Sequence, residues 1–283
     1  MNIRTSRIAL AGVLAASTLA LIPAGANAST PATTSTPATT AAAKSNHAVK
    51  PTVVLVHGAW ADASGWNAVT RRLQAKGYTV IAPPNLLRSL DEDSAYLKSF
   101  LATISGPIVL VGHSYGGAVI TNAATGNPNV TSLVYISAYA PDQGETIAEA
   151  GALAGGDNSV LVSHLIKRPY PNATGAVDTT VDPAWFPKLF AADAPLNETK
   201  LMATQQRPLS SAAFAGETGV PAWKSIPAYY LVSLDDKTIP PVAEKAMAAR
   251  AAKGRTVEIH SSHAAMVAHP AQVTDLILRA ARS

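Results

Sequence analysis

Runs of β-branched and aliphatic residues recur along the chain from residue 52 onward, and longer mixed segments separate them. A continuous apolar run is typical of a strand buried on both faces of a parallel sheet, because a half-exposed strand alternates apolar and polar side chains. Six such strands are predicted, at residues 52–56, 78–81, 108–111, 133–136, 228–232 and 256–259.

The segments between these runs have the features of helices. Gly77 follows the first of them, as is common at the end of a helix. The second begins with Asp91, Glu92 and Asp93, where the helix dipole favours negative charge. Helices are expected at residues 64–76, 91–103, 115–124, 242–252 and 270–282. The alternation predicts an α/β fold with a mostly parallel sheet of about six strands, flanked by helices.

Residues 141–221 interrupt this alternation and are rich in Gly, Pro and Asn. A structureless loop of that length is uncommon in a compact domain, so we expect a small cap inserted over the carboxyl edge of the sheet. The segment contains Trp185 and Phe186, followed by Phe190. These aromatic residues either line a substrate pocket beneath the cap or form the core of the cap itself, and the sequence leaves both interpretations open.

The first 28 residues have the pattern of a signal peptide. Arg4 and Arg7 precede an apolar run at residues 8–22, and Ala26-Asn27-Ala28 matches a small-x-small cleavage site. The apolar run is shorter than the roughly 20 residues of a membrane-spanning helix. We therefore expect an exported protein, secreted or periplasmic, without a stable membrane anchor.

Residues 29–50 consist mainly of Thr, Ala, Ser and Pro, with almost no large apolar side chain. Such a segment cannot bury enough surface to offset the entropy lost on ordering, so we expect a disordered linker. The remaining residues, 51–283, are sufficient for one α/β domain with its cap insertion.

Composition narrows the chemistry. The chain has no cysteine, which excludes disulfides and thiolate metal sites and requires any nucleophile to be an oxygen or a nitrogen. The net charge of +4 falls to +2 once Arg4 and Arg7 are removed with the signal peptide. This charge is too small and too dispersed for a nucleic-acid-binding surface, so no nucleic-acid partner is expected.

The strongest motif is Gly112-His113-Ser114-Tyr115-Gly116, which matches G-x-S-x-G. A bare motif of this kind is often an ordinary turn. Here a predicted strand precedes it and a predicted helix follows it, which is the context of a nucleophile elbow. The sequence therefore predicts that Ser114 is a catalytic nucleophile.

A serine nucleophile requires a base. After a nucleophile elbow, the partners follow along the chain in the order acid, then histidine, so the base is expected near the C-terminus. His263 lies just beyond the last predicted strand and is the candidate. His260 ends that strand and is expected to be held in the sheet, whereas His269 precedes Pro270 at the start of a helix. His113 is expected to pack beside the elbow. No H-E-x-x-H grouping accompanies these histidines, so no metal is expected.

In a catalytic triad of this order, the acid is expected after the strand that precedes the last one, here residues 228–232. Asp235 and Asp236 follow that strand and are adjacent. The carboxylate of the acid fixes the tautomer of the imidazole and stabilises the imidazolium. Adjacent side chains cannot both face His263, and the residues by themselves leave the choice open.

Two backbone N–H groups should bind the oxyanion of the transition state. One is that of Tyr115, directly after the nucleophile, and the other is expected from the loop after the first strand, at Ala59. Trp60 follows in the same loop and is a candidate substrate contact.

Four segments together resemble the α/β-hydrolase superfamily, and within it the methylesterase and hydroxynitrile-lyase branch. They are His57-Gly58-Ala59-Trp60, residues 112–117, residues 236–240 and Ser262-His263. The resemblance covers residues 51–283. In that branch the acid precedes a Lys-x-Ile-Pro-like segment, which favours Asp236 over Asp235 as the triad acid.

The resemblance also indicates which chemistry to expect. Lyases of this branch carry threonine in place of Gly58 and lysine in place of Ala264, and this chain has neither. The resemblance therefore implies a serine esterase that acts on a small-molecule ester through an acyl-enzyme on Ser114 and needs no cofactor or metal. A small-molecule binding protein that retains the triad, a perhydrolase and a lyase-like enzyme are the alternatives. The sequence carries no signal for the identity of the ester or for the oligomeric state.

Overall fold

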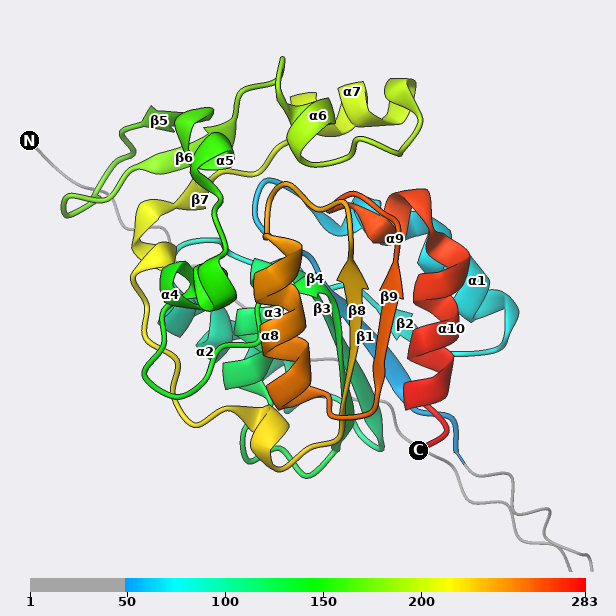
Figure 1. Cartoon of the computed structure of the whole chain (residues 1–283). Helices are drawn as coiled ribbons and strands as arrows, with labels where there is room; N and C mark the ends of the chain where they lie inside the picture. The colour runs from blue at the N-terminus through cyan, green and yellow to red at the C-terminus, as the bar shows by residue number, and fades with distance from the viewer. Residues whose placement is uncertain (1–48) are drawn as a thin grey trace, which may run out of the picture. The chain divides into compact units, whose positions relative to one another are not determined.

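The computed structural model describes residues 49–283. The expected signal peptide and nearly all of the expected linker lie outside the described residues. Six strands form one sheet in the order β2-β1-β3-β4-β8-β9, and every neighbouring pair is parallel (Figure 1). The strands are β1 (Thr52–Val56), β2 (Val80–Ile81), β3 (Ile108–Ser114), β4 (Val130–Ala138), β8 (Ala228–Ser233) and β9 (Thr256–Ile259). The predicted fold class is confirmed.

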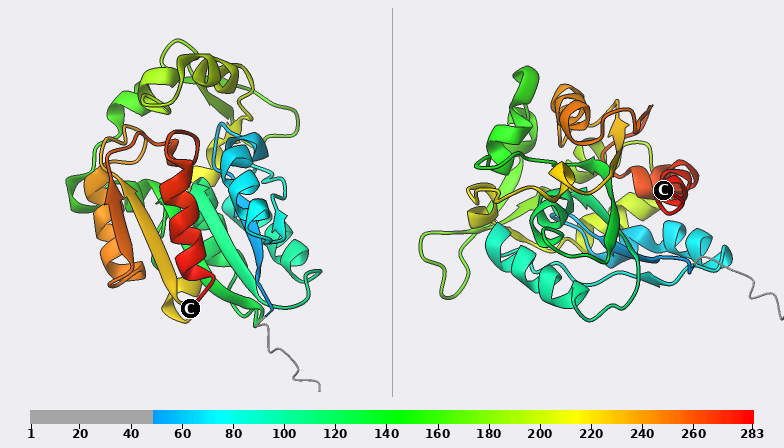
Figure 2. Two further views of the ribbon diagram at one scale, coloured as in Figure 1. Left: turned by 90° about the vertical axis from the view of Figure 1, so that its right-hand side faces the viewer. Right: turned by 90° about the horizontal axis from the view of Figure 1, so that it is seen from below.

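Helices cover both faces of this sheet, as Figures 1 and 2 show. On one face lie α2 (Leu90–Leu101), α3 (Tyr115–Ala123) and α8 (Pro241–Ala251); on the other lie α1 (Asn67–Ala75), α9 (Ala265–Ala268) and α10 (Pro270–Ala280). A short 3₁₀ helix, Ala63–Trp66, precedes α1.

The strand side chains alternate between two apolar cores. Along β3, Ile108 and Leu110 belong to the core beneath α2, α3 and α8, whereas Val109 and Val111 belong to the core beneath α1 and α10. All four side chains are fully buried. Burial on both faces explains why the strands read as continuous apolar runs in the sequence.

The chain between β4 and β8 contains regular structure, which forms a cap above the carboxyl ends of the strands (Figure 1). Its strands β5 (Leu165–Arg168), β6 (Asp178–Val181) and β7 (Leu209–Ser210) form a separate antiparallel sheet. Its helices are α4 (Ile147–Gly151), α5 (Ser159–Ser163), α6 (Phe186–Leu189) and α7 (Leu196–Thr204), with 3₁₀ turns at Leu153–Gly155, Ser211–Phe214 and Ala222–Lys224.

The cap is hydrogen-bonded to the loops that follow β8 and β9. Thr238 Oγ1 donates to the carbonyl of Leu189 at 2.9 Å, and Ala264 N–H donates to the carbonyl of Phe190 at 3.0 Å. The end of α6 is therefore joined to both loops that carry candidate catalytic residues. Within residues 49–283, no helix is long and apolar enough to cross a membrane.

Candidate active site

Ser114 lies at the junction of β3 and α3 with φ 54° and ψ −127°, a backbone conformation that residues other than glycine rarely adopt. Glycines make this sharp turn possible. A β-carbon on Gly112 would lie 2.6 Å from the carbonyl oxygen of Gly116, and one on Gly116 would lie 2.7 Å from that of Val56. The strained turn places Ser114 at the carboxyl edge of the sheet, beneath the cap.

Asp236 and His263 form a buried pair. The Nδ1–H of His263 donates to Asp236 Oδ2 at 2.6 Å, and both side chains are completely buried. Asp236 Oδ1 accepts two further bonds, from the N–H groups of Thr238 at 2.6 Å and Ile239 at 2.9 Å. Three donors therefore fix the direction of this carboxylate.

The adjacent aspartate faces away from this pair. The side chain of Asp235 is 58% exposed, and its Oδ2 lies 3.2 Å from Nδ1 of His260. The side chain of His260 is itself 82% exposed, so the expectation that the sheet holds this residue is wrong. The physical reason is that β9 ends at Ile259, which leaves His260 in the following loop.

The opposite nitrogen of His263, Nε2, is buried and has no hydrogen-bond partner within residues 49–283. Such an atom is available to accept a proton. His113 positions His263: the Nε2–H of His113 donates to the backbone carbonyl of His263 at 3.0 Å, and the two ring centroids are 4.6 Å apart. Burial, followed by the neighbouring His263, holds the pKa of His113 well below its usual value.

The loop after β1 runs directly against the elbow. A β-carbon on Gly58 would lie 2.6 Å from the β-carbon of Ser114. Ala59 and Tyr115, the two residues expected to supply oxyanion donors, line the same cavity as Ser114.

A His–Asn pair that the sequence analysis missed fixes this loop. The N–H of Asn85 donates to His57 Nε2 at 3.0 Å, and the side-chain amide of Asn85 donates to the carbonyl of His57 at 3.0 Å. His57 Nδ1–H donates to the carbonyl of Gly58 at 2.9 Å. Both nitrogens are thus committed in the neutral ring, and burial lowers the pKa of His57. Asn85 belongs to no regular element, so no periodic signal could have identified it.

Tyr115 is anchored at its other end by an acid from the predicted first turn of α2. Its hydroxyl donates to Asp93 Oδ2 at 2.7 Å, and Asp93 Oδ1 accepts from the N–H of Arg88 at 3.1 Å. Burial raises the pKa of Asp93. Of the three acidic residues in that turn, only Asp93 is buried.

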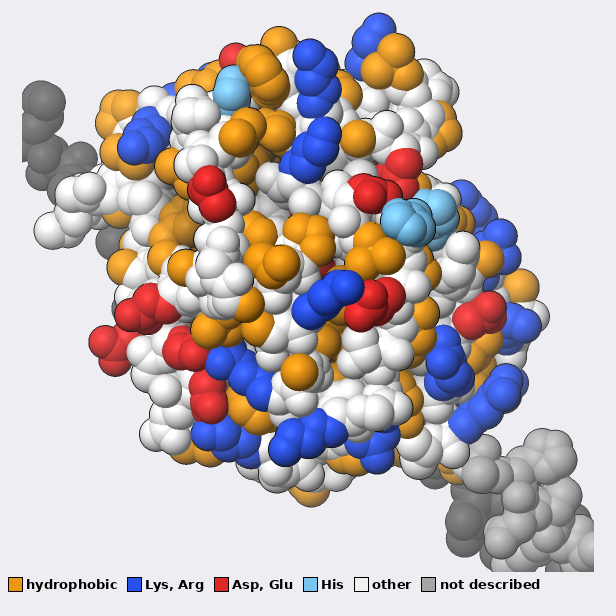
Figure 3. Space-filling view, viewed as in Figure 1, with side chains coloured by type: hydrophobic (Ala, Val, Ile, Leu, Met, Phe, Trp, Pro, Cys, Tyr) orange, Lys and Arg blue, Asp and Glu red, His pale blue; other side chains and the backbone are white. Residues whose placement is uncertain are grey.

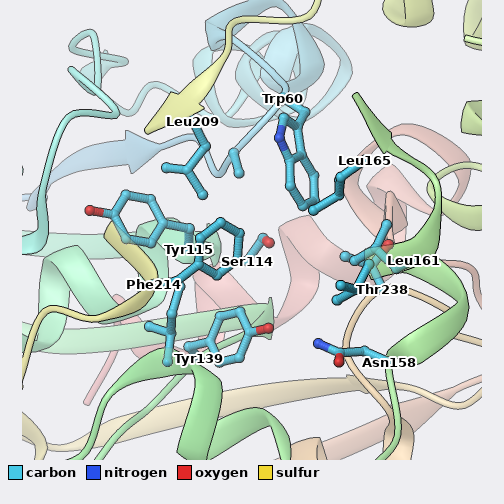
Figure 4. Close-up of a pocket in the computed structure, with 13 residues that line it drawn as sticks. Trp60, Ser114, Tyr115, Tyr139, Asn158, Leu161, Leu165, Leu209, Phe214 and Thr238 are labelled. Atoms are coloured by element: carbon cyan, nitrogen blue, oxygen red, sulfur yellow. The ribbon is translucent and has the colours of Figure 1, made fainter. Parts of the chain in front are cut away.

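A narrow cavity opens beside Ser114 (Figure 4). The sheet side contributes Trp60, Tyr115 and Tyr139, and the cap contributes mainly apolar side chains. The polar exceptions are Asn158, from the cap, and Thr238. The cavity is thus an apolar chamber with few polar groups, as is typical of sites for small molecules.

Of the three candidate substrate contacts, Trp60 lines this cavity and Trp185 and Phe186 do not. Phe186 is fully buried and stacks on Phe190, with centroids 4.7 Å apart, as part of the core of the cap. The ring of Phe190 in turn meets that of His263 edge-on at 4.8 Å.

Trp185 lies on the outside of the cap. It is 36% exposed, packs on the ring of His164 at 3.8 Å and borders a separate surface groove with Val160 and Pro240. Hydrophobic side chains are visible on this face, where the cap meets the α/β body (Figure 3). Within residues 49–283, no group of three or more His, Asp or Glu side chains is arranged to hold a metal ion.

Comparison with known proteins agrees with this architecture. A model of the Alpha/beta hydrolase family matches residues 53–276. The carbendazim hydrolyzing esterase of Nocardioides sp. (strain SG-4G) is 32% identical over 107 residues, which cover 33% of this chain and 44% of that protein. Methylesterase 18 of Arabidopsis thaliana is 27% identical over 254 residues, covering 81% of this chain and 97% of that protein.

Solved structures share the fold. The crystal structure of a pyrethroid hydrolase from Sphingobium faniae JZ-2 matches with a TM-score of 0.70 and 22% identity, covering 82% of this chain and 98% of that one. The chain therefore spans less than half of the first curated relative but nearly the whole of Methylesterase 18 and of the solved structure.

Proposed function

The chain belongs to the alpha/beta hydrolase family, and from this premise we propose that it is a serine esterase that cleaves a small carboxylic ester through an acyl-enzyme on Ser114. The observation that carries the proposal is the buried 2.6 Å bond between His263 Nδ1 and Asp236 Oδ2, which leaves Nε2 of the same ring unpartnered. A ring in this state is oriented to act as a general base.

The proposed reaction proceeds in two halves. The Ser114 oxygen attacks the acyl carbon of the ester while its proton passes to His263 Nε2, and Asp236 stabilises the resulting imidazolium. The N–H groups of Ala59 and Tyr115 stabilise the oxyanion. The alcohol departs with the proton from His263, and water then attacks the acyl-enzyme by the same route, releasing the acid and free Ser114.

The cavity and the relatives favour a compact, apolar or aromatic ester. A narrow, mainly apolar chamber with Asn158 and Thr238 as its polar exceptions offers much apolar contact and few hydrogen bonds. The similar proteins include an esterase and a methylesterase. A polymer or a highly charged substrate would find little complementary surface in such a chamber.

Hydrolysis is favoured over lyase chemistry by the packing at two positions. A side chain at Gly58 would overlap Ser114, so this backbone has no room for the threonine of the lyases. Ala264 is completely buried, so the packing around its β-carbon leaves no space for the lysine of the lyases.

The purified chain should be labelled at Ser114 by a fluorophosphonate probe and should hydrolyse members of a p-nitrophenyl ester panel, with the Ser114→Ala variant as the control. Absence of both labelling and turnover would contradict an esterase and favour a small-molecule binding protein. Addition of hydrogen peroxide to the same assay, with peracid as the measured product, separates hydrolysis from perhydrolysis.

We further propose that the protein is exported and processed after Ala28. The support is the signal-peptide pattern of residues 1–28, with Arg4 and Arg7 before an apolar run and Ala26-Asn27-Ala28 at its end. The extracellular and periplasmic fractions of expressing cells should contain a chain that begins at Ser29, as determined by intact mass. A chain that retains Met1 and stays in the cytoplasm would contradict export.

A further inference from the structure

A second carboxyl group is buried beside the Asp236–His263 pair. Glu244 lies in the first turn of α8 and is 0% exposed. Its Oε2 accepts a hydrogen bond from the N–H of Ser233 at 3.1 Å, at the end of β8. The N–H of Asp236 donates to the carbonyl of the same Ser233 at 3.3 Å, and the Asp236 side chain is likewise 0% exposed. The two carboxyl groups are therefore buried around one turn, and Oε1 of Glu244 has no conventional donor within residues 49–283.

Two neighbouring carboxyl groups that are both out of water cannot readily both be ionised, because their repulsion and the cost of desolvation add. The donors decide which group keeps the proton. Asp236 receives three donors, from Thr238, Ile239 and His263, whereas Glu244 receives one, from Ser233. The negative charge therefore belongs on Asp236 and the proton on Glu244.

The surroundings of Glu244 support this assignment. The titratable groups that act on it, or on which it acts, are Asp236, Tyr230 and Tyr139, and none of them is a cation. Burial, followed by the charge of Asp236, holds the pKa of Glu244 well above its usual value. An ionised Glu244 would need a neighbouring cation, and the two tyrosines, which stay neutral, cannot supply that positive charge.

We infer that Glu244 is a positioning residue of the reaction, a neutral carboxylic acid whose O–H donates to Asp236 and gives the triad carboxylate a fourth donor. The inference rests on the proposed serine esterase function. It does not place Glu244 in contact with the substrate: the residue acts only through Asp236 and, beyond it, through His263.

The consequence for catalysis follows from charge. A fourth donor spreads the negative charge of Asp236 and weakens its attraction for a protonated His263. The ring therefore remains neutral, and able to accept the Ser114 proton, at lower pH than it would beside an Asp236 with three donors. Loss of the donor should move the acidic limb of the kcat/KM profile to higher pH.

Two substitutions separate this role from a purely structural one. In Glu244→Gln, the amide oxygen can still accept from Ser233 and the amide N–H can still donate to Asp236, so the profile should match that of the wild type. In Glu244→Met, the side chain has a similar volume but no donor, and the acidic limb should move up by about half a pH unit or more. Glu217→Gln, at an exposed position, is the matched control.

The two variants also reveal the protonation state. If Glu244 were ionised, Glu244→Gln would remove a negative charge beside the Asp236–His263 pair and move the acidic limb to lower pH. A downward shift in Glu244→Gln, or a Glu244→Met profile that superimposes on the wild type, would overturn the inference. A loss of activity in both variants without a change in the pH profile would likewise reduce Glu244 to a structural role.

A measurement that needs no turnover keeps this test separate from the proposed function. The ring signals of His263, identified by their loss in His263→Gln, can be titrated by NMR in the full chain. The pH midpoint of those signals should rise in Glu244→Met and remain unchanged in Glu244→Gln. An inactive wild type with this pattern would refute the esterase proposal alone, whereas an active wild type without it would refute the role of Glu244 alone.

Discussion

Asp236 and Asp235 are neighbours in sequence with opposite environments, one completely buried and the other 58% exposed. The difference arises because the Oδ1 atom of Asp236 accepts two backbone N–H groups of the following turn. Those bonds direct the second oxygen to His263. A difference of one position in the sequence thus determines which of the two carboxylates can orient His263.

We expect Asp236→Asn to lower kcat by about 10³- to 10⁴-fold, because an amide cannot stabilise the imidazolium and favours the wrong tautomer. Asp235→Asn should remain within about twofold of the wild type, since an exposed ion pair contributes little. Steady-state hydrolysis of one p-nitrophenyl ester compares the pair. Equal losses in both variants would contradict the assignment of Asp236.

Two buried histidines, His57 and His113, should make the stability of the protein sensitive to acid. Burial lowers the pKa of each below the ordinary 6.5. Their contribution to stability is therefore complete above about pH 6.5 and is lost as the pH falls below it, because the unfolded chain binds protons that the folded chain does not.

The unfolding temperature of the wild type should accordingly decrease as the pH is lowered from 7.5 to 5. In His113→Met one of the two histidines is removed, so the decrease per pH unit should be smaller, whatever the starting temperature. His164→Gln, at a more exposed histidine, should keep the slope of the wild type. Identical slopes in His113→Met and the wild type would contradict a neutral His113.

At the level of elements, the cap has both an outer and an inner surface, and α5 contributes to each. Leu161 is 3% exposed and lines the cavity beside Ser114, whereas its neighbour Val160 is 55% exposed. Adjacent positions of one short helix therefore distinguish effects on the cavity from effects on the cap as a whole.

Leu161→Trp should fill part of the cavity and restrict the esters that are accepted. We expect KM to rise at least about tenfold for longer acyl chains and to change little for acetate esters, because the extra volume removes apolar contacts for the larger group alone. Val160→Trp is the matched control. A uniform change for all chain lengths would mean that Leu161 does not limit the cavity.

Most of the α/β body could be predicted from sequence, for a physical reason. Strands buried on both faces carry an uninterrupted apolar signal, and β9 was expected at the same residues that it occupies. The prediction was less accurate where neighbours set the boundary: β3 continues through Ser114, and β2 contains only two residues. The four-residue helix α9 is too short to show a periodic pattern.

The candidate site was predictable where backbone geometry demands a residue type. The elbow around Ser114 requires glycines, and the order of acid and histidine along the chain indicated His263 and the Asp235-Asp236 pair, of which the family resemblance favoured Asp236. Contacts between distant segments gave no such signal. Asn85 hydrogen-bonds to His57, 28 residues earlier in the chain, and the ring of Phe190 in the cap meets that of His263. Both depend on tertiary packing that a single sequence does not encode locally.

At the level of the whole molecule, both apolar cores and all the candidate catalytic residues lie within residues 49–283. A chain that begins at residue 49 should therefore fold, with an unfolding temperature within about 2 °C of that of the chain from Ser29 and an unchanged kcat/KM. Calorimetry and the ester assay check this. A marked loss in either would assign a structural role to residues 29–48.

The insertion of the cap between two neighbouring strands has a consequence for the order of folding. β4 pairs with β8, joining Leu133 to Ala228 across the entire cap, whereas β1, β3 and β4 are connected by much shorter segments. Closing the longer loop costs more entropy, so the half of the sheet that carries Ser114 can assemble before the half that carries Asp236 and His263. After dilution from denaturant, the rate at which ester hydrolysis recovers would then report the formation of the half that carries Asp236 and His263. Until that half forms, Ser114 would be in place without its base.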